Sequence, residues 1–194
     1  FRRWLRVYVD YCTPECVYKN NNHNWQSLFL MCSGVVLGDT QVFERGLGYY
    51  QSGFHIQVER DGALPMEMWR KEKCATYTLM ALEAMLQAAF IAGRHGHPEV
   101  LQLRSDAGTS LRDAVNCLVS FLEAPDTWQV ERRRASGGPQ PQNRPEDPSD
   151  WGWALELPCV WWGDDHYAKY MGRRPYGEGI RAYSLSYATL LFAR

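Results

Sequence analysis

The residues best suited to chemistry in this chain form one polar run, Lys19-Asn20-Asn21-Asn22-His23-Asn24-Trp25, at the start of an amphipathic segment. Asparagine is a favourable N-cap because its side-chain oxygen accepts hydrogen bonds from the free N–H groups of a first helical turn. One cap accounts for only one of the four asparagines. A helix N-terminus also favours a nearby anion. The histidine, the amides and the adjacent indole could therefore bind an acidic sugar.

A second candidate group is the string Asp61-Gly62-Ala63-Leu64-Pro65-Met66-Glu67, which Arg70 and then Tyr77 follow. The planar guanidinium of an arginine can bind a carboxylate through two parallel hydrogen bonds. Tyr77 lies about two helical turns beyond Arg70, so both could lie along one helix face. Taken singly, each has a simpler explanation: core packing for the tyrosine, a solvated charged face for the arginine, and a structural role for His23.

In combination, these residues resemble the alginate lyase domain of polysaccharide lyases. The resemblance rests on an Asn-His pair before a helix, the Asp-Gly-x-Leu-Pro-x-Glu string and the Arg-x6-Tyr spacing. It covers about residues 1–95 well and the remainder loosely. It implies an incomplete α/α toroid and cleavage of an acidic polyuronate, such as alginate or a glucuronan, by β-elimination. It also implies an active site of Asn22, His23, Arg70 and Tyr77.

The chemistry of a uronic acid gives each of these residues a role. The C5 proton is only weakly acidic, and neutralising the adjacent carboxylate stabilises the carbanion-like transition state. An amide and a permanent cation, Asn22 and Arg70, are suited to this task. Tyr77 could remove the proton and then protonate the departing O4 oxygen, and His23 is the alternative base when the C5 proton lies on the opposite face. The scheme requires no metal and no other cofactor.

Three further residues, Trp25, Glu67 and Trp69, are predicted to contact the substrate. An indole can stack on a sugar ring, although Trp25 could equally be the first core position of its helix. The substrate, an acidic polysaccharide, is the only partner that we expect.

Two other functions remain open at this stage. A glycoside hydrolase on an α/α barrel would need two carboxylates across the scissile bond. Candidates are Glu67, Asp164 and Asp165, with Trp161 and Trp162 as a stacking platform, but no spacing rule selects a pair. A non-catalytic module that binds acidic glycans could use the same aromatic and cationic groups.

Helical periodicity recurs along the chain and no segment gives a clear strand pattern. Residues 63–67 are interpreted as irregular, and Ser110 with Asp113 resembles a capping box. Antiparallel helix pairs would suit this pattern, but periodicity does not distinguish an α/α toroid from a plain bundle. The expected helices are 1–11, 25–37, 41–54, 70–93, 98–103, 110–122 and 183–192.

Length and composition predict one all-α domain over residues 1–194. The net charge of −1 gives no reason to expect nucleic acid or a membrane surface as a partner, and we expect a monomer. No uninterrupted apolar run reaches the length of a membrane-spanning helix. The composition of residues 134–150, rich in Pro, Gly, Gln and charge, predicts a flexible surface loop.

The first helix begins at once, with no start methionine or cap, so we expect a chain cut from a longer one. Such a helix should expose an apolar patch involving Phe1, Trp4 or Leu5. The family resemblance implies a secreted or periplasmic protein.

Six cysteines leave the compartment open. Cys32, Cys74 and Cys117 fall in apolar helical segments and are expected to be buried thiols. Cys12 and Cys16 could form a disulfide, whereas a zinc site would need two more ligands at matching spacing, and none is found.

Overall fold

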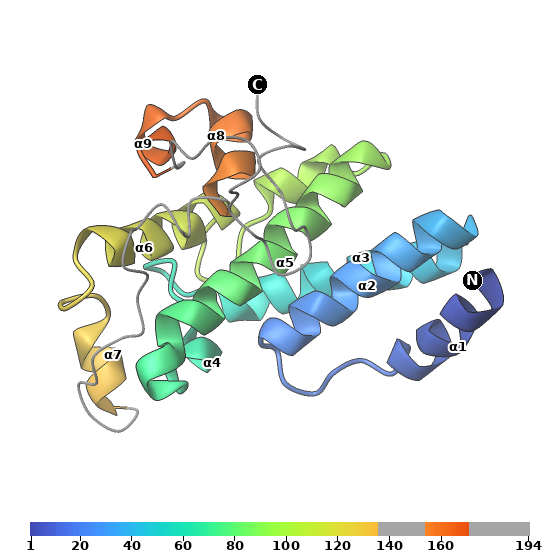
Figure 1. The fold of residues 1–194 in the computed structure, drawn as a ribbon, viewed down its shortest axis with the longest axis horizontal. Helices are drawn as coiled ribbons and strands as arrows, with labels where there is room; N and C mark the ends of the chain where they lie inside the picture. Colours follow the sequence, from blue (N-terminus) through green and yellow to red (C-terminus); the bar gives the residue numbers. More distant parts are fainter. Residues whose placement is uncertain (136–153, 171–194) are drawn as a thin grey trace.

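The computed structural model describes residues 1–135 and 154–170, and this part of the chain is helical with no strand. Three long helices form its centre: α2 (Asn21–Leu37), α3 (Thr40–Gln57) and α5 (Cys74–Arg94). Figure 1 shows α2 and α3 as a hairpin, with α1 (Arg2–Cys12) along the outer side and α6 (Leu111–Glu123) on the opposite side of α5. The described residues are therefore an all-α array, as predicted.

The shorter elements connect or cover the long helices. They are α4 (Pro65–Met68), two 3₁₀ helices, η1 (Lys71–Lys73) and η2 (Pro98–Gln102), α7 (Val130–Ala135), α8 (Glu156–Trp162) and α9 (Asp165–Ala168). Two contacts attach α8 and α9 to the long helices and α6. Tyr167 Oη of α9 donates to Asn116 Oδ1 of α6 at 2.7 Å, and the Trp161 ring of α8 lies 6.4 Å from that of Phe90 on α5.

Helix α2 begins earlier than the sequence pattern indicates. Its N-cap is Asn20, whose side chain accepts from the N–H of Asn22 at 3.0 Å. Asn22 and His23 therefore lie in the first helical turn rather than in a loop before it. At the other end Gly38 adopts a left-handed conformation with φ 63°, which stops the helix as predicted.

Glycines allow α2 and α3 to approach closely. A Cβ placed on Gly46 would lie 2.7 Å from Met31 N, and one placed on Gly34 would lie 2.5 Å from Phe43 N. Glycine inside a helix usually lowers the stability of that helix. Here Gly34 and Gly46 are the reason that the two backbones can pack against each other.

The main core lies between α2, α3, α5 and α6, and it is closed by residues of α8 and α9. Tyr50, Phe54, Met85 and Leu118 are almost completely buried there. A second cluster surrounds Trp128, whose ring packs edge-on against Phe121 at 5.2 Å. By mean hydropathy α5 with its preceding turn could cross a membrane, but 67% of that apolar window is buried inside the protein, as is usual for a core helix.

Helix α1 packs one face and exposes the other. Leu5 and Val9 contact the α2–α3 hairpin, whereas Phe1 is 81% and Trp4 53% exposed. The expected apolar patch is therefore present at Phe1 and Trp4, but Leu5 belongs to the core. Arg6 forms an ion pair with Asp39 that ties α1 to the start of α3.

Several boundaries differ from those predicted. Residues 65–68 form α4 rather than an irregular segment, because Pro65 is favourable in a first helical turn. Helix α5 starts at Cys74 instead of residue 70, and it continues through Gly93 to Arg94. The Ser110–Asp113 capping box is present in both directions, as predicted. The proposed last helix, 183–192, and most of the 134–150 segment lie outside the described residues.

All six cysteines are free thiols, so Cys12 and Cys16 do not form a disulfide. Burial raises the pKa of Cys117 to about 11, which keeps this thiol protonated and unreactive. Cys74 is buried as well, and Cys32 is only partly so.

Candidate active site

A sharp turn between α4 and α5 positions Arg70. Lys71, the next residue, has φ 54°, a left-handed conformation that few non-glycine residues adopt. The chain therefore reverses at this point, and the Arg70 guanidinium carbon comes to lie 4.7 Å from the ring centroid of Tyr77. The two residues do meet, but through this turn and not along one continuous helix face.

Glu67 connects Arg70 to the start of α2. Its Oε1 accepts the backbone N–H of Asn21 at 2.7 Å, and its Oε2 lies 3.6 Å from Arg70 Nε. Glu67 is 1% exposed, and burial raises the pKa of its carboxyl, whereas the Asn21 N–H and Arg70 act to lower it. These contacts are with protein groups, so Glu67 positions Arg70 relative to the start of α2. Its predicted contact with a substrate stays a prediction.

The Glu67 link brings three helix ends together. Figure 1 shows α4 and the first turns of α2 and α5 at one end of the central helices. Asn22 is exposed at this end, directly after the residue that Glu67 holds. Tyr77 is half-buried, and the Arg70 side chain is 35% exposed. The Asn22 amide, the Arg70 guanidinium and the Tyr77 phenol are thus at least partly exposed at this end of the central helices.

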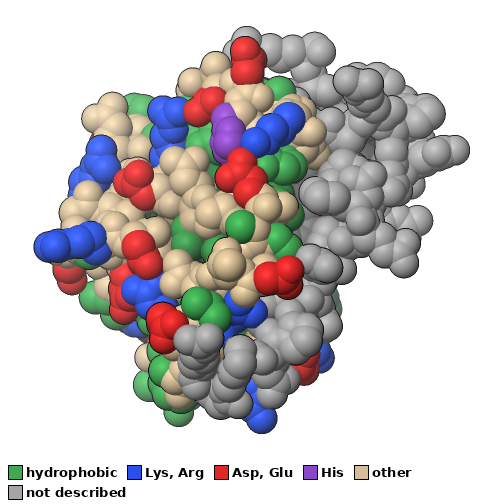
Figure 2. Space-filling view, turned by 90° about the vertical axis from the view of Figure 1, so that its left-hand side faces the viewer, with side chains coloured by type: hydrophobic (Ala, Val, Ile, Leu, Met, Phe, Trp, Pro, Cys, Tyr) green, Lys and Arg blue, Asp and Glu red, His purple; other side chains and the backbone are tan. Residues whose placement is uncertain are grey.

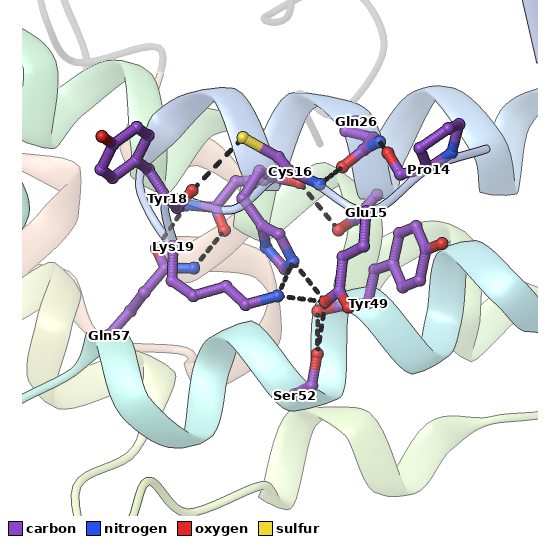
Figure 3. A network of polar contacts seen from close by, with 12 residues as sticks. Pro14, Glu15, Cys16, Tyr18, Lys19, Gln26, Tyr49, Ser52 and Gln57 are labelled. Carbon is purple, nitrogen blue, oxygen red and sulfur yellow. Dashed lines mark hydrogen bonds and ion pairs between the residues drawn. The ribbon is translucent and has the colours of Figure 1, made fainter. Parts of the chain in front are cut away.

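His23 has a different environment. Its side chain is fully buried, and its Nε2 lies 3.0 Å from Glu15 Oε1 and 2.9 Å from Lys19 Nζ. Figure 3 shows these groups and Ser52 around the same point, between the loop that precedes α2 and the middle of α3. Within the described residues no contact joins His23 to Arg70 or Tyr77.

The electrostatics of this cluster favour a neutral imidazole beside an ionised carboxylate. Burial lowers the pKa of His23, although the neighbouring Glu15 acts to raise it. Hydrogen bonds from Lys19 and then His23 lower the pKa of Glu15 to about 2. At neutral pH Nε2–H of His23 can donate to the carboxylate, which fixes the tautomer.

The opposite edge of the imidazole packs against Gly53 of α3. A Cβ at that position would lie 2.6 Å from both Cε1 and Nδ1 of His23, so only glycine fits. Nδ1 is buried and has no hydrogen-bond partner. A reciprocal pair of 3.0 Å hydrogen bonds between the Asn24 and Gln57 amides holds the same stretch of α2 against α3.

The remaining predicted residues lie in different settings. Trp25 is partly buried against the main core, so at least part of its indole serves packing. Trp69 is 65% exposed next to Arg70 and is available to a ligand. Of the residues around His23, only Lys19 belongs to the polar run that the sequence indicates, and it has no role assigned there. Glu15 lies four residues before Lys19, a spacing that suits an ion pair, but nothing local indicates Ser52.

Two of the three carboxylates of the hydrolase hypothesis, Asp164 and Glu67, contact other protein groups, and Asp165 is exposed in the first turn of α9. Asp164 caps α9 and forms an ion pair with Arg112 at 2.6 Å, whereas Glu67 is buried in α4. Trp161 and Trp162 pack against the main core. Figure 2, the face at the left of Figure 1, shows basic and acidic side chains interspersed, without one continuous patch of either sign.

Comparison with known proteins decides the family. Residues 1–128 match the family model described as alginate lyase. The chain belongs to the alginate lyase family. This confirms the resemblance drawn from the Asn-His pair, the Asp-Gly-x-Leu-Pro-x-Glu string and the Arg-x6-Tyr spacing.

Two curated relatives of this family member are themselves named as lyases. An alginate lyase of Pseudomonas fluorescens is 27% identical over 112 residues, which are 57% of this chain and 29% of that protein. A polysaccharide lyase of Stenotrophomonas maltophilia is 28% identical over 78 residues, 40% of this chain and 23% of that protein. The match thus spans less than a third of either relative.

The fold of this family member is that of a solved alginate lyase. The crystal structure of alginate lyase A1-III from Sphingomonas species A1 superposes with a TM-score of 0.79 at 21% identity, over 100% of this chain and 53% of that one. A histidine-to-alanine variant of alginate lyase A1-III complexed with a tetrasaccharide gives a TM-score of 0.66 at 20% identity, over 90% and 48% of the two chains. The all-α, toroid-type fold class is therefore confirmed.

Proposed function

We propose that this chain carries catalytic residues of a polysaccharide lyase that cleaves an acidic polyuronate, alginate or a glucuronan-like polymer, by β-elimination. The observation that carries the proposal is the placement of Arg70 over Tyr77 beside the first turn of α2. Membership of the alginate lyase family supports it, and so does the tetrasaccharide bound to a protein of the same fold.

Arg70 and Asn22 bind the carboxylate of the sugar whose C5 proton is removed. The guanidinium supplies a permanent charge and two parallel donors. The exposed Asn22 amide supplies a neutral donor from the helix N-terminus, where the backbone also favours an anion. Neutralising the carboxylate spreads the negative charge that develops at C5 when its proton leaves.

Tyr77 transfers the protons. Its phenolate takes the C5 proton, the C5 electron pair forms the C4–C5 double bond, and the bond from C4 to the glycosidic oxygen breaks. The departing oxygen then takes a proton from the tyrosine, which regenerates the phenolate. One residue can perform both steps only when the proton and the leaving group are on the same face of the sugar ring. The adjacent Arg70 supplies the positive charge beside this phenol.

His23 is the second candidate for the base, for sugars whose C5 proton lies on the other face. Its Nε2 is covered by Glu15 and Lys19, so this role requires those side chains to move. We also propose that the protein is secreted or periplasmic, because the polymer is too large to enter a cell freely. A further part of the proposal is that the protein acts as a monomer.

Product analysis tests the proposal directly. The full-length protein is incubated with alginate, glucuronan and a neutral polysaccharide, and both ultraviolet absorbance and reducing ends are followed. A lyase produces a conjugated C4–C5 double bond together with each new end. Reducing ends without absorbance would show a hydrolase, and binding without either product would show a non-catalytic glycan-binding module.

A further inference from the structure

We propose that the side chain of Glu15 occupies a carboxylate-binding subsite, which Lys19 and Ser52 complete over His23. In the free protein the site holds the chain's own carboxylate, and in the complex it holds a carboxylate of the acidic polysaccharide. Glu15 is then an internal competitor of the substrate. The inference rests on the proposed function for the identity of the ligand, and on the geometry for the site itself.

Three donors from three segments converge on one oxygen of Glu15. His23 Nε2 of α2 lies 3.0 Å from Glu15 Oε1, and Ser52 Oγ of α3 lies 3.2 Å from it. The ammonium group of Lys19, in the loop before α2, contacts the same oxygen. A cation, an imidazole N–H and a hydroxyl around one point form a site for a carboxylate, whichever molecule supplies it.

Glu15 is the member of this cluster that can leave. Its side chain is 37% exposed, whereas that of His23 is completely buried and is confined by Gly53. Rotation of this partly exposed side chain would therefore vacate the position beside Nε2 that a ligand carboxylate can take, while Lys19 stays next to the imidazole. Figure 3 shows Glu15 and Lys19 entering the cluster from the loop, with Ser52 on α3 below them.

The backbone around Glu15 is held independently of its side chain. The amide of Gln26 donates to the carbonyl oxygens of Cys12 at 2.7 Å and Pro14 at 2.6 Å. The same side chain accepts the N–H of Cys16 at 2.8 Å. The loop would thus keep its path while Glu15 exchanges with a ligand, and removing the carboxylate should not release the loop.

The physical reason for an internal occupant is the cost of a partly buried charge without a partner. Without a carboxylate the Lys19 ammonium would lose its counter-charge, and Nε2 of His23 would keep only that ammonium beside it. Glu15 prevents this in the free protein, and a uronate carboxylate can prevent it in the complex. Every sugar of a polyuronate carries a carboxylate, so a polymer bound through one of them at Arg70 presents others to neighbouring subsites.

The test measures binding separately from turnover. Full-length protein with Tyr77→Phe, and the same protein with Glu15→Gln added, are titrated with a uronate oligosaccharide by calorimetry. We expect Glu15→Gln to lower the Kd about tenfold. A change of this size follows if the binding site is open in about a tenth of the parent molecules and in nearly all molecules of the variant, because the apparent Kd is inversely proportional to the open fraction. Lys19→Met should raise the Kd in either background, and a neutral oligosaccharide should show neither change.

Glu44→Gln is the matched control, because it removes one negative charge from an exposed position of α3 outside the cluster. Glu15→Ala is the second variant, because the glutamine amide could still occupy the site. An unchanged or higher Kd for both Glu15 variants, measured at a temperature well below the unfolding transition of each, overturns the inference. So does a drop in Kd that Glu44→Gln reproduces. Absence of elimination products would instead overturn the proposed function, and it would leave this binding result standing.

Discussion

The guanidinium of Arg70 lies over the ring of Tyr77, 4.7 Å from its centroid, although the two residues do not share a helix. A turn with a left-handed Lys71 brings them together, and the buried Glu67 holds Arg70 beside the start of α2. A guanidinium, which is suited to binding a carboxylate, and a phenol, which is suited to transferring protons, thus lie side by side. The proposed elimination depends on this pair.

Tyr77→Phe tests the proton-transfer role. The change keeps the ring and its contact with Arg70 but removes the hydroxyl. Turnover on a polyuronate, followed by absorbance of the unsaturated product, should fall by about 10²- to 10⁴-fold, the usual contribution of a general acid or base. Tyr11→Phe, at an 83% exposed position of α1, should leave the rate unchanged. Near-normal turnover of Tyr77→Phe would assign proton transfer to another residue, with His23 the first to examine.

Arg70→Lys tests carboxylate binding by a planar donor. A lysine retains the charge but neither the two parallel donors nor the flat surface that covers the tyrosine ring. We expect KM to rise as well as kcat to fall, because the substrate carboxylate is already charged before the reaction. Steady-state kinetics on the same polymer measure both. A variant with unaltered constants would show that charge alone is sufficient at this position.

Gly53→Ala tests the packing that fixes His23. The added methyl group would lie 2.6 Å from the imidazole, and overpacking of this kind costs about 1–3 kcal/mol of unfolding free energy. Gly48→Ala is the control on the same helix, because its new Cβ meets nothing within 4 Å and should stabilise α3 by about 0.5–1 kcal/mol. Chemical denaturation measures both.

A double variant shows whether the imidazole is the cause of that loss. In the His23→Ala background, Gly53→Ala should cost less than it does alone, because the two imidazole atoms at 2.6 Å are absent and only the contact with Gln57 Nε2 at 2.8 Å remains. Equal costs in the two backgrounds would place the clash elsewhere.

Acid should weaken the Glu15 cluster over two intervals of pH. The folded-state pKa of His23 is lowered by burial. The contribution of His23 to folding stability is therefore fully present above its unfolded pKa of 6.5 and declines as the pH falls below that value. Glu15, lowered from 4.5 to about 2 by Lys19 and His23, contributes above pH 4.5 and loses its contribution as the pH falls toward 2. Thermal unfolding of parent and Glu15→Gln proteins between pH 7 and pH 2 should therefore converge below pH 4.5. A constant difference down to pH 2 would show that the carboxylate does not have this lowered pKa.

The sequence by itself determined the features that depend on neighbouring residues. The Ser110–Asp113 capping box, the stop at Gly38 and the apolar periodicity of α5 are local signals, and each appears in the structure. The Asn-His, Arg and Tyr spacing also identified the family, because a motif keeps its order along the chain whatever path the chain takes. The start of α2 was placed too late because Asn20 through Asn24 offer several competing caps, and the structure uses the first.

Only the tertiary structure decided which of these residues meet. Glu15 and His23 are joined to Ser52 because the glycines of α2 and α3 let the two helices approach closely. Glu67 joins Asn21 to Arg70 because the chain turns sharply at Lys71. Contacts between residues this far apart in sequence depend on how helices pack and where the backbone reverses. Periodicity and caps specify each helix alone, so they could indicate the four candidate residues but not the separate surroundings of His23 and of the Arg70–Tyr77 pair.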